Sequence, residues 1–90
     1  MMLTPEELLD LLKYDITTDK LGSIIYQFNG EVHRDEDQPA VIYADGSEYW
    51  YQHGKIHRDN GQPAVINADG TKSLYIDGKF IRRESTTYTA

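Results

Sequence analysis

The chain has 90 residues, enough for one small domain with a thin core, and its net charge of −6 comes from 15 acidic and 9 basic residues. It lacks cysteine, which excludes disulfide bridges and thiolate metal sites and fits a cytoplasmic location. The acidic balance argues against direct nucleic-acid binding, and no apolar run is long enough to span a membrane. We therefore expect a single cytoplasmic domain over residues 1–90.

A short amphipathic helix is expected within residues 1–15. Its start is marked by Thr4 at the N-cap, Pro5 at the first helical position, Glu7 in a capping box, and Leu3 and Leu8 as a hydrophobic staple. Its apolar stripe consists of Leu8, Leu9, Leu11 and Leu12. Because so short a helix is not stable alone, we expect this stripe to cover one end of a sheet. The alternative is a helix that binds a partner.

A connector at residues 15–22 leads into a series of turns that contain glycine. Four of them carry Asn-Gly or Asp-Gly, the pairs favoured in two-residue hairpin turns with positive φ at both residues: Asn29-Gly30, Asp45-Gly46, Asp69-Gly70 and Asp77-Gly78. Between the turns we expect short strands at residues 23–28, 47–52 and 71–76. Two longer arms, 31–44 and 55–68, contain Pro39 and Pro63. Because proline cannot donate a ladder hydrogen bond, we expect a bulge in a bent strand there, with a full extra turn as the alternative.

Residues 30–53 and 54–77 are two copies of one 24-residue unit. Laid over each other without a gap, they are identical at 13 of 24 positions. A third partial copy begins at Gly78, and a degenerate one occupies residues 22–29. A fixed period of this size is typical of repeat architectures, in which one unit stacks on the next. We therefore expect a β-repeat sheet over residues 22–84 and a polar tail at 85–90.

Spacing assigns the faces of this sheet. A small apolar set recurs at two-residue intervals and is expected to face the core: Ala40, Ile42 and Ala44, with Ala64, Ile66 and Ala68. Two further apolar columns are expected along the repeats: Val32, Ile56 and Phe80, and Tyr26, Trp50 and Leu74.

The unit G-K-I-H-R-D-N-G-Q-P-A-V-I-N-A-D-G, preceded by Y-W-Y-Q-H-G, resembles MORN-like repeats. It is most similar to the H-R-x-x-G-P-A variant found in uncharacterised proteins of tailed phages and large DNA viruses, although Gln38 and Gln62 replace the usual glycine. The resemblance covers about residues 23–84. It implies a mainly β fold, an antiparallel β-meander after the helix, and a role in binding rather than catalysis.

The ionisable residues suggest three kinds of chemical site: a kinase catalytic loop, a metal site and a hydrolytic His/Asp site. For each one, the sequence lacks a required feature. The His-Arg-Asp triplets resemble a kinase catalytic loop, but the position that needs asparagine holds Ala40 or Ala64. If each unit contributes two strands, the equivalent residues His33 and His57 lie roughly 10 Å apart, which is too far for one metal ion to bind both. A small hydrolase using a His/Asp site stays open as an alternative, although a thin sheet offers no cleft. We expect no cofactor, no metal and no catalytic residue.

Arginine recurs once per unit, at Arg34, Arg58 and Arg82, next to Asp35 and Asp59 in the two full copies. Such regularity indicates a structural ladder in which each guanidinium binds a turn or a neighbouring carboxylate. The two copies differ mainly in aromatic content. Tyr43 and Tyr49 of the first copy become Asn67 and Ser73 in the second.

Tyrosine is favoured at the centres of protein interfaces. We therefore expect a partner-binding surface made by the first copy, composed of Tyr43, Tyr49 and Tyr51, with His33 and His53 at its rim. Packing of the tyrosines within the sheet is the alternative.

The sequence predicts a non-enzymatic protein-interaction module, monomeric or homodimeric. By resemblance it is a phage or prophage accessory protein that binds and inhibits or modulates a host protein, for example in a defence system such as CRISPR. The alternatives are an acidic nucleic-acid mimic, which needs more clustered carboxylates, and a lipid-surface module, which needs basic patches.

Overall fold

The computed structural model describes residues 2–84, apart from the side chains of Asp10 and Leu11. The described chain is mainly antiparallel β-sheet with one short helix, α1 (Pro5–Leu12). The strands are β1 (Asp15–Thr18), β2 (Ile24–Phe28), β3 (Glu31–Val32), β4 (Val41–Ile42), β5 (Glu48–Tyr49), β6 (Tyr51–Gln52), β7 (Lys55–Ile56), β8 (Val65–Ile66), β9 (Lys72–Ile76) and β10 (Lys79–Glu84).

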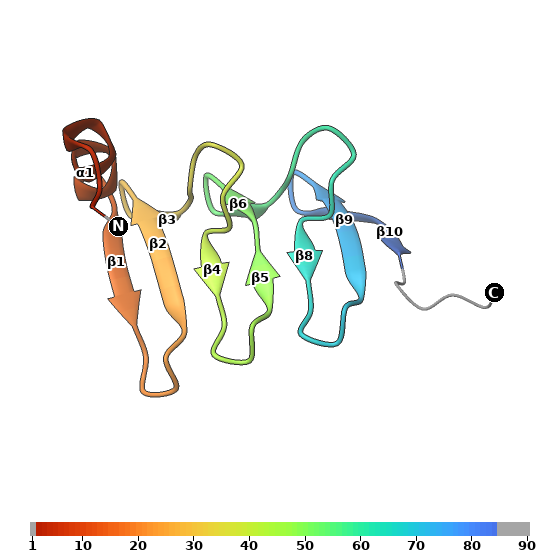
Figure 1. Ribbon diagram of the computed structural model, residues 1–90. Helices are drawn as coiled ribbons and strands as arrows, with labels where there is room; N and C mark the ends of the chain where they lie inside the picture. Colours follow the sequence, from red (N-terminus) through yellow and green to blue (C-terminus); the bar gives the residue numbers. More distant parts are fainter. Residues whose placement is uncertain (1, 85–90) are drawn as a thin grey trace.

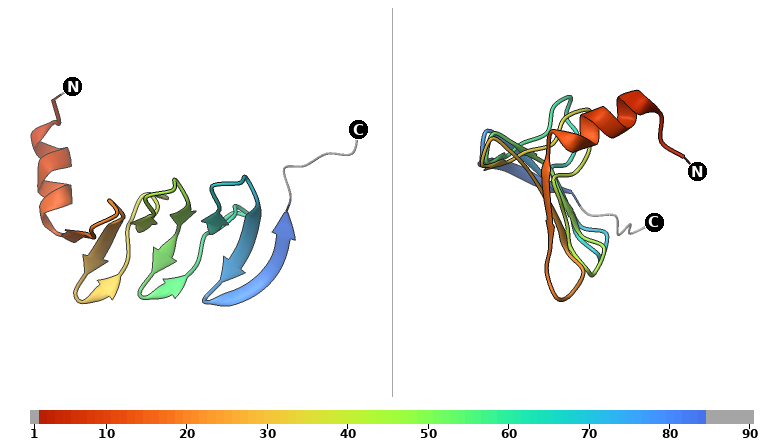
Figure 2. Two further views of the ribbon diagram at one scale, coloured as in Figure 1. Left: turned by 90° about the horizontal axis from the view of Figure 1, so that it is seen from below. Right: turned by 90° about the vertical axis from the view of Figure 1, so that its left-hand side faces the viewer.

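The strands form a row of hairpins that starts beside α1 and ends at β10 (Figure 1). The long sheet has the order β1-β2-β4-β5-β8-β9-β10, with β3 also paired to β2, and β6 pairs with β7 in a small second sheet. Every pairing is antiparallel. Seen from the helix end, the hairpins overlay and their strands are bent rather than flat (Figure 2, right). The molecule measures 46 × 26 × 26 Å.

The start of α1 follows its sequence signals. The Thr4 backbone N–H donates to Glu7 Oε1 at 2.9 Å, and the Glu7 N–H donates to Thr4 Oγ1 at 3.2 Å. This reciprocal pair is the predicted capping box, and the backbone hydrogen bonds lower the pKa of Glu7. The helix ends at Leu12, and Tyr14 beyond it is buried at 8% exposure.

The apolar stripe of α1 does not dock on the sheet as expected. Leu8, Leu9 and Leu12 are 49%, 67% and 77% exposed, because the helix projects away from the strands (Figure 2, left). Tyr14 instead anchors this end of the chain, with its ring edge-on to Tyr26 at a centroid distance of 5.7 Å.

A first strand occupies half of the region expected to be a connector. β1 pairs with β2 in register from Asp15 opposite Gln27 to Thr18 opposite Ile24. The following turn is closed by the Asp19 carboxylate, which accepts hydrogen bonds from the backbone N–H groups of Leu21 and Ser23. All four side chains of β1 are exposed, so the strand carries no alternating apolar pattern.

The hairpin turns are of two kinds. Positive φ at both central residues occurs at Asn29-Gly30, His53-Gly54 and Asp77-Gly78, as expected for two-residue turns. At Asp45-Gly46 and Asp69-Gly70 the expectation was wrong, since only the glycines have positive φ, at 96° and 92°. The Tyr43 carbonyl there accepts the Gly46 N–H at 2.9 Å, giving a longer turn that ends in a left-handed glycine.

A full extra turn interrupts each long arm, so the expected bulge was wrong and its alternative is what the chain adopts. Glu36 and Asp37 have φ of 63° and 57°, and the Gln38 N–H donates to the Asp35 carbonyl at 3.4 Å. The second copy repeats this turn at residues 59–62. Strand pairing therefore stops before the proline and resumes after it.

The core is thin and regular, and the structure corrects part of the expected core face. Ala40 and Ala64 are fully buried, whereas Ala44 and Ala68 are exposed. The two-residue alternation ends early because β4 and β8 each span only two residues before a turn begins. Other buried side chains include Val41, Val65, Trp50 and Leu74, with the hydroxyl side chains of Ser23, Ser47 and Ser73.

The third partial copy makes one continuous strand. β10 runs along β9, with a register shift between Phe80 and Arg82 in the place where the earlier copies leave the sheet for the extra turn. Phe80, expected in an apolar column, is 55% exposed. Glu84 is the last residue of β10, and the rest of the predicted tail lies outside the described residues.

Candidate functional site

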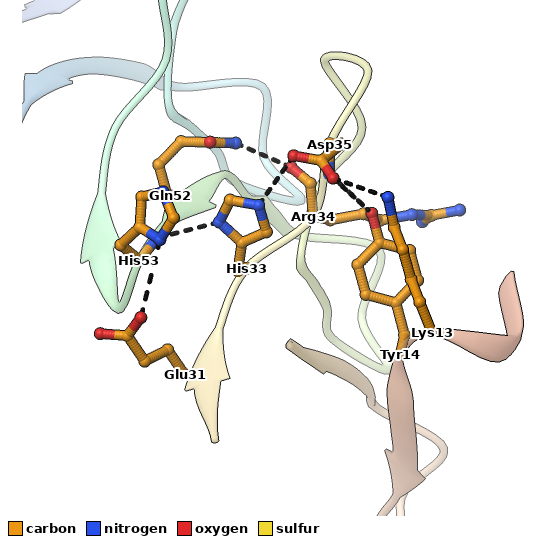
Figure 3. A network of polar contacts seen from close by, with 8 residues as sticks. All are labelled: Lys13, Tyr14, Glu31, His33, Arg34, Asp35, Gln52 and His53. Carbon is orange, nitrogen blue, oxygen red and sulfur yellow. Dashed lines mark hydrogen bonds and ion pairs between the residues drawn. The ribbon is translucent and has the colours of Figure 1, made fainter. Parts of the chain in front are cut away.

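Asp35 is the centre of a polar network that joins the helix end to the first extra turn (Figure 3). Its carboxylate lies 2.9 Å from Lys13 Nζ, 2.8 Å from His33 Nε2 and 3.4 Å from the Tyr14 hydroxyl. The Tyr14 oxygen also accepts the Asp35 backbone N–H at 2.9 Å. The hydrogen bonds from Lys13 and His33 lower the pKa of Asp35, so it is ionised at neutral pH.

His33 has both ring nitrogens occupied. Its Nδ1 accepts the backbone N–H of His53 at 3.0 Å, so the ring proton of the neutral imidazole must sit on Nε2, which donates to Asp35. His57 repeats this arrangement, with the Asp77 N–H at 3.0 Å and Asp59 at 2.7 Å. Each histidine therefore ties its turn to a hairpin 20 residues further along.

This placement corrects the expectation that His33 lines a partner surface. The residue is only 4% exposed, so its side chain cannot reach a partner. The alternative of a hydrolytic His/Asp site is disfavoured for the same residues, because a general base needs a free nitrogen directed at a substrate. In both copies the pair holds the fold together.

His53 is exposed, with 71% of its side chain accessible. Its ring lies 4.6 Å from that of His33, and its Nδ1 is 3.6 Å from Glu31 Oε1. It sits at the turn between β6 and β7, whereas Tyr43 sits at the turn between β4 and β5. The two lie at opposite ends of the β5–β6 segment, but Tyr51 is only two residues before His53, so the position of His53 at the rim of the tyrosine surface stays a prediction.

Arg34 and Arg58 each close an extra turn. Their Nη1 atoms donate to the carbonyls of Pro39 at 3.3 Å and Pro63 at 3.0 Å. Each guanidinium also stacks on an aromatic ring eight residues earlier in the chain, Arg34 on Tyr26 at 3.8 Å and Arg58 on Trp50 at 4.0 Å. Arg82 differs, because it has no extra turn to close and contacts Glu84 at 3.3 Å.

Asp37 links the two full copies, a role that the sequence did not reveal. Its carboxylate accepts two hydrogen bonds from Arg58, at 2.7 and 3.1 Å, and these lower its pKa. Its carbonyl accepts the Trp50 indole N–H at 3.0 Å. The corresponding residue of the second copy is Gly61, which carries no carboxylate.

The predicted tyrosines form one cluster, which we call the tyrosine face: Tyr43, Tyr49, Tyr51 and the additional Tyr75. The rings of Tyr43 and Tyr49 meet edge to face at a centroid distance of 5.1 Å. Burial raises the pKa of Tyr51, and the nearby hydroxyls of Tyr43, Tyr49 and Tyr75 raise it further. Tyr43 is the most open member at 41% exposure, and Tyr49 and Tyr51 are half-buried.

The described residues contain no group of three or more His, Asp or Glu side chains able to hold a metal ion. Within residues 2–84, no helix combines the length and apolarity needed to cross a membrane. A scan against protein-family models, a search of curated proteins and a search of solved structures each found no match. The resemblance to MORN-like repeats therefore stays a prediction from the motif residues.

Proposed function

We propose that the protein is a non-enzymatic binding module that holds a partner protein on the tyrosine face. The observation that carries this proposal is the gathering of four tyrosines from β5, β6, β9 and the turn after β4, with Tyr43 41% exposed beside the half-buried Tyr49 and Tyr51. Tyrosine side chains offer both apolar area and a hydroxyl, and they are enriched at the centres of protein interfaces.

The difference between the two copies supports a binding role for this face. At the positions of Tyr43 and Tyr49, the second copy has Asn67 and Ser73. The second copy makes the same His–Asp, Arg–Pro and Ser–backbone hydrogen bonds as the first without these rings. Since the repeated contacts do not need the two tyrosines, a contact outside the fold explains them better.

The partner class rests on charge and on the resemblance. A net charge of −6 favours a basic partner surface. The H-R-x-x-G-P-A-type repeat favours a phage or prophage accessory protein, with a host protein that it inhibits or modulates as its partner. The same resemblance leads us to propose a MORN-like repeat array after the N-terminal helix as the architecture of this module.

The test replaces the tyrosines by the residues of the second copy. A Tyr43→Asn, Tyr49→Ser double variant should fold, because the same residue types occupy the corresponding places in residues 54–77. We expect affinity for a partner captured from host lysate to fall at least about 30-fold, which is about 2 kcal/mol, as for an interface hot spot.

Ile16→Ala serves as the control, since it removes an exposed apolar side chain from β1, at the end of the sheet far from Tyr75. Affinity is measured by titration of the captured protein, identified by mass spectrometry, and folding by a thermal melt. Equal binding by the double variant and the control, both with intact melts, would place the contact elsewhere and refute the proposal.

A further inference from the structure

Exposed large apolar side chains gather at the two ends of the row of hairpins. Seven lie in or beside α1 and the β1–β2 hairpin turn: Met2, Leu3, Leu8, Leu9, Leu12, Ile16 and Leu21. Three lie at the other end: Ile76, Phe80 and Ile81. Among the described residues between these ends, Tyr43 alone belongs to this class. Water-exposed apolar groups are thus concentrated where a stacked array is open.

The two ends also carry opposite charge. Residues 1–22 contain five acidic and two basic side chains, a net charge of −3. Residues 72–84 contain four basic and two acidic side chains, a net charge of +2. The intervening segment is acidic, so the β10 end is the basic part of an otherwise negative chain. The acidic helix end and the basic strand end are therefore electrostatically complementary.

Both ends lack the cover that a stacked array needs. β10 pairs with β9 along one edge, and no described strand pairs with its other edge. Three leucines of the α1 stripe, Leu8, Leu9 and Leu12, are exposed rather than packed on their own sheet. The two ends of a molecule 46 Å long lie far apart, so α1 cannot reach its own β10 (Figures 1 and 2).

We propose that α1 of one molecule docks on the β10 end of a second copy, so that the helix caps its neighbour's sheet. The leucines of α1 then cover Phe80 and Ile81, and Glu6 and Glu7 lie near the basic side chains of β10. Such a contact joins two different surfaces and can repeat from molecule to molecule. Phe80 packs on Tyr75 at a centroid distance of 5.5 Å, so the contact adjoins one member of the tyrosine face, but it does not rest on the proposed function.

Sedimentation velocity on the intact protein tests the assembly. The average mass should rise above 10.3 kDa with increasing concentration, pass the dimer, and fall again at high salt. Two variants should each reduce association at least about tenfold: Leu9→Glu in the helix and Ile81→Glu in β10, because each buries a carboxylate in an apolar contact. Gln62→Glu adds the same charge in the middle of the row and should assemble like the unaltered protein.

Mixing the two variants gives the sharpest readout. The intact helix of the Ile81→Glu variant can dock on the intact β10 of the Leu9→Glu variant, so an equimolar mixture should form dimers that grow no further. Each variant alone should stay monomeric. The formation of the mixed dimer also shows that both variants are folded. If Leu9→Glu lowers the melting temperature, Glu6→Lys provides a milder change on the same helix.

Three results would overturn the proposal. One is a monomer at every concentration up to about 1 mM, a weak affinity by the usual scale. Another is a mixture of folded variants that stays monomeric. The third is normal assembly by Ile81→Glu alone, which indicates a symmetric helix-to-helix contact.

Discussion

Replacing Arg58 by alanine should be among the most damaging single changes in the extra turns. The side chain is 14% exposed, donates to the Pro63 carbonyl at 3.0 Å, binds Asp37 through two hydrogen bonds and stacks on Trp50. Leaving the carbonyl without its donor costs about 1–3 kcal/mol, and losing the stack costs about 0.5–1 kcal/mol. The ion pair adds about 0–1 kcal/mol, because Asp37 is 61% exposed.

Together these contributions give a loss of about 3 kcal/mol in the free energy of unfolding. The melting temperature should fall by at least about 10 °C for a domain of this size. Arg58→Lys should recover only part of the loss, because lysine keeps the charge but cannot bind the carboxylate and the carbonyl together.

The two other arginines that recur once per unit, Arg34 and Arg82, provide matched controls in the same protein. Arg34 makes the same turn contact and stack without a carboxylate partner, so Arg34→Ala should cost about 2 kcal/mol. Arg82 has 60% of its side chain exposed, and its guanidinium pairs with Glu84 in the described part of the chain, so Arg82→Ala should cost less than about 0.5 kcal/mol. Urea denaturation measures all three. Equal losses, or a loss below about 0.5 kcal/mol for Arg58→Ala, would refute this account of the turns.

Three further outcomes are expected. Glu36→Asn, the residue of the second copy, should stabilise by about 0.5–1 kcal/mol in a thermal melt, because asparagine tolerates the positive φ of 63° better than glutamate does. Leu9→Ala should change the free energy of unfolding of the monomer by less than about 0.5 kcal/mol, since the side chain is 67% exposed; a larger loss means that the stripe is packed. The pKa values of Asp35 and Asp37 lie below 3.8, so their stabilising contribution is complete above that value and is lost as the pH falls through it. The melting temperature should be flat from pH 7 to about 5 and fall below about pH 4; no fall on acidification means that the ion pairs contribute nothing.

Local signals predicted the local features of this fold. The capping box at Thr4 and Glu7 and the two-residue turns at Asn29-Gly30 and Asp77-Gly78 depend on neighbouring residues, so the sequence was sufficient. β1 was missed because all four of its side chains are exposed, which leaves no alternation to detect. Its isoleucine and two threonines, which are β-branched, were the available signal.

The candidate site depends on contacts that no local pattern reveals. His33 looked like a surface residue, but the backbone N–H of His53, 20 residues away, meets its Nδ1 and buries the ring. The extra turn was foreseeable in part, because Asn60-Gly61 in the second copy is a favoured pair for two positive φ values. In the first copy the same two positions hold Glu36 and Asp37, so the favoured pair is absent there.

Two of the differences between the copies, at Asp37 and at Tyr43, have different physical reasons. Asp37 accepts a strained φ of 57°, which Gly61 adopts freely, and in exchange it binds Arg58 of the next unit. Asp37 is therefore explained by a contact within the fold. The second copy needs no carboxylate at Gly61, because no arginine of a further extra turn follows it. Tyr43 has no such explanation: its ring contacts another tyrosine of the same cluster and remains 41% exposed. If folding alone had shaped the first copy, the residues that distinguish it from the second copy should make contacts within the fold, as Asp37 does with Arg58. The tyrosine face does not meet this expectation.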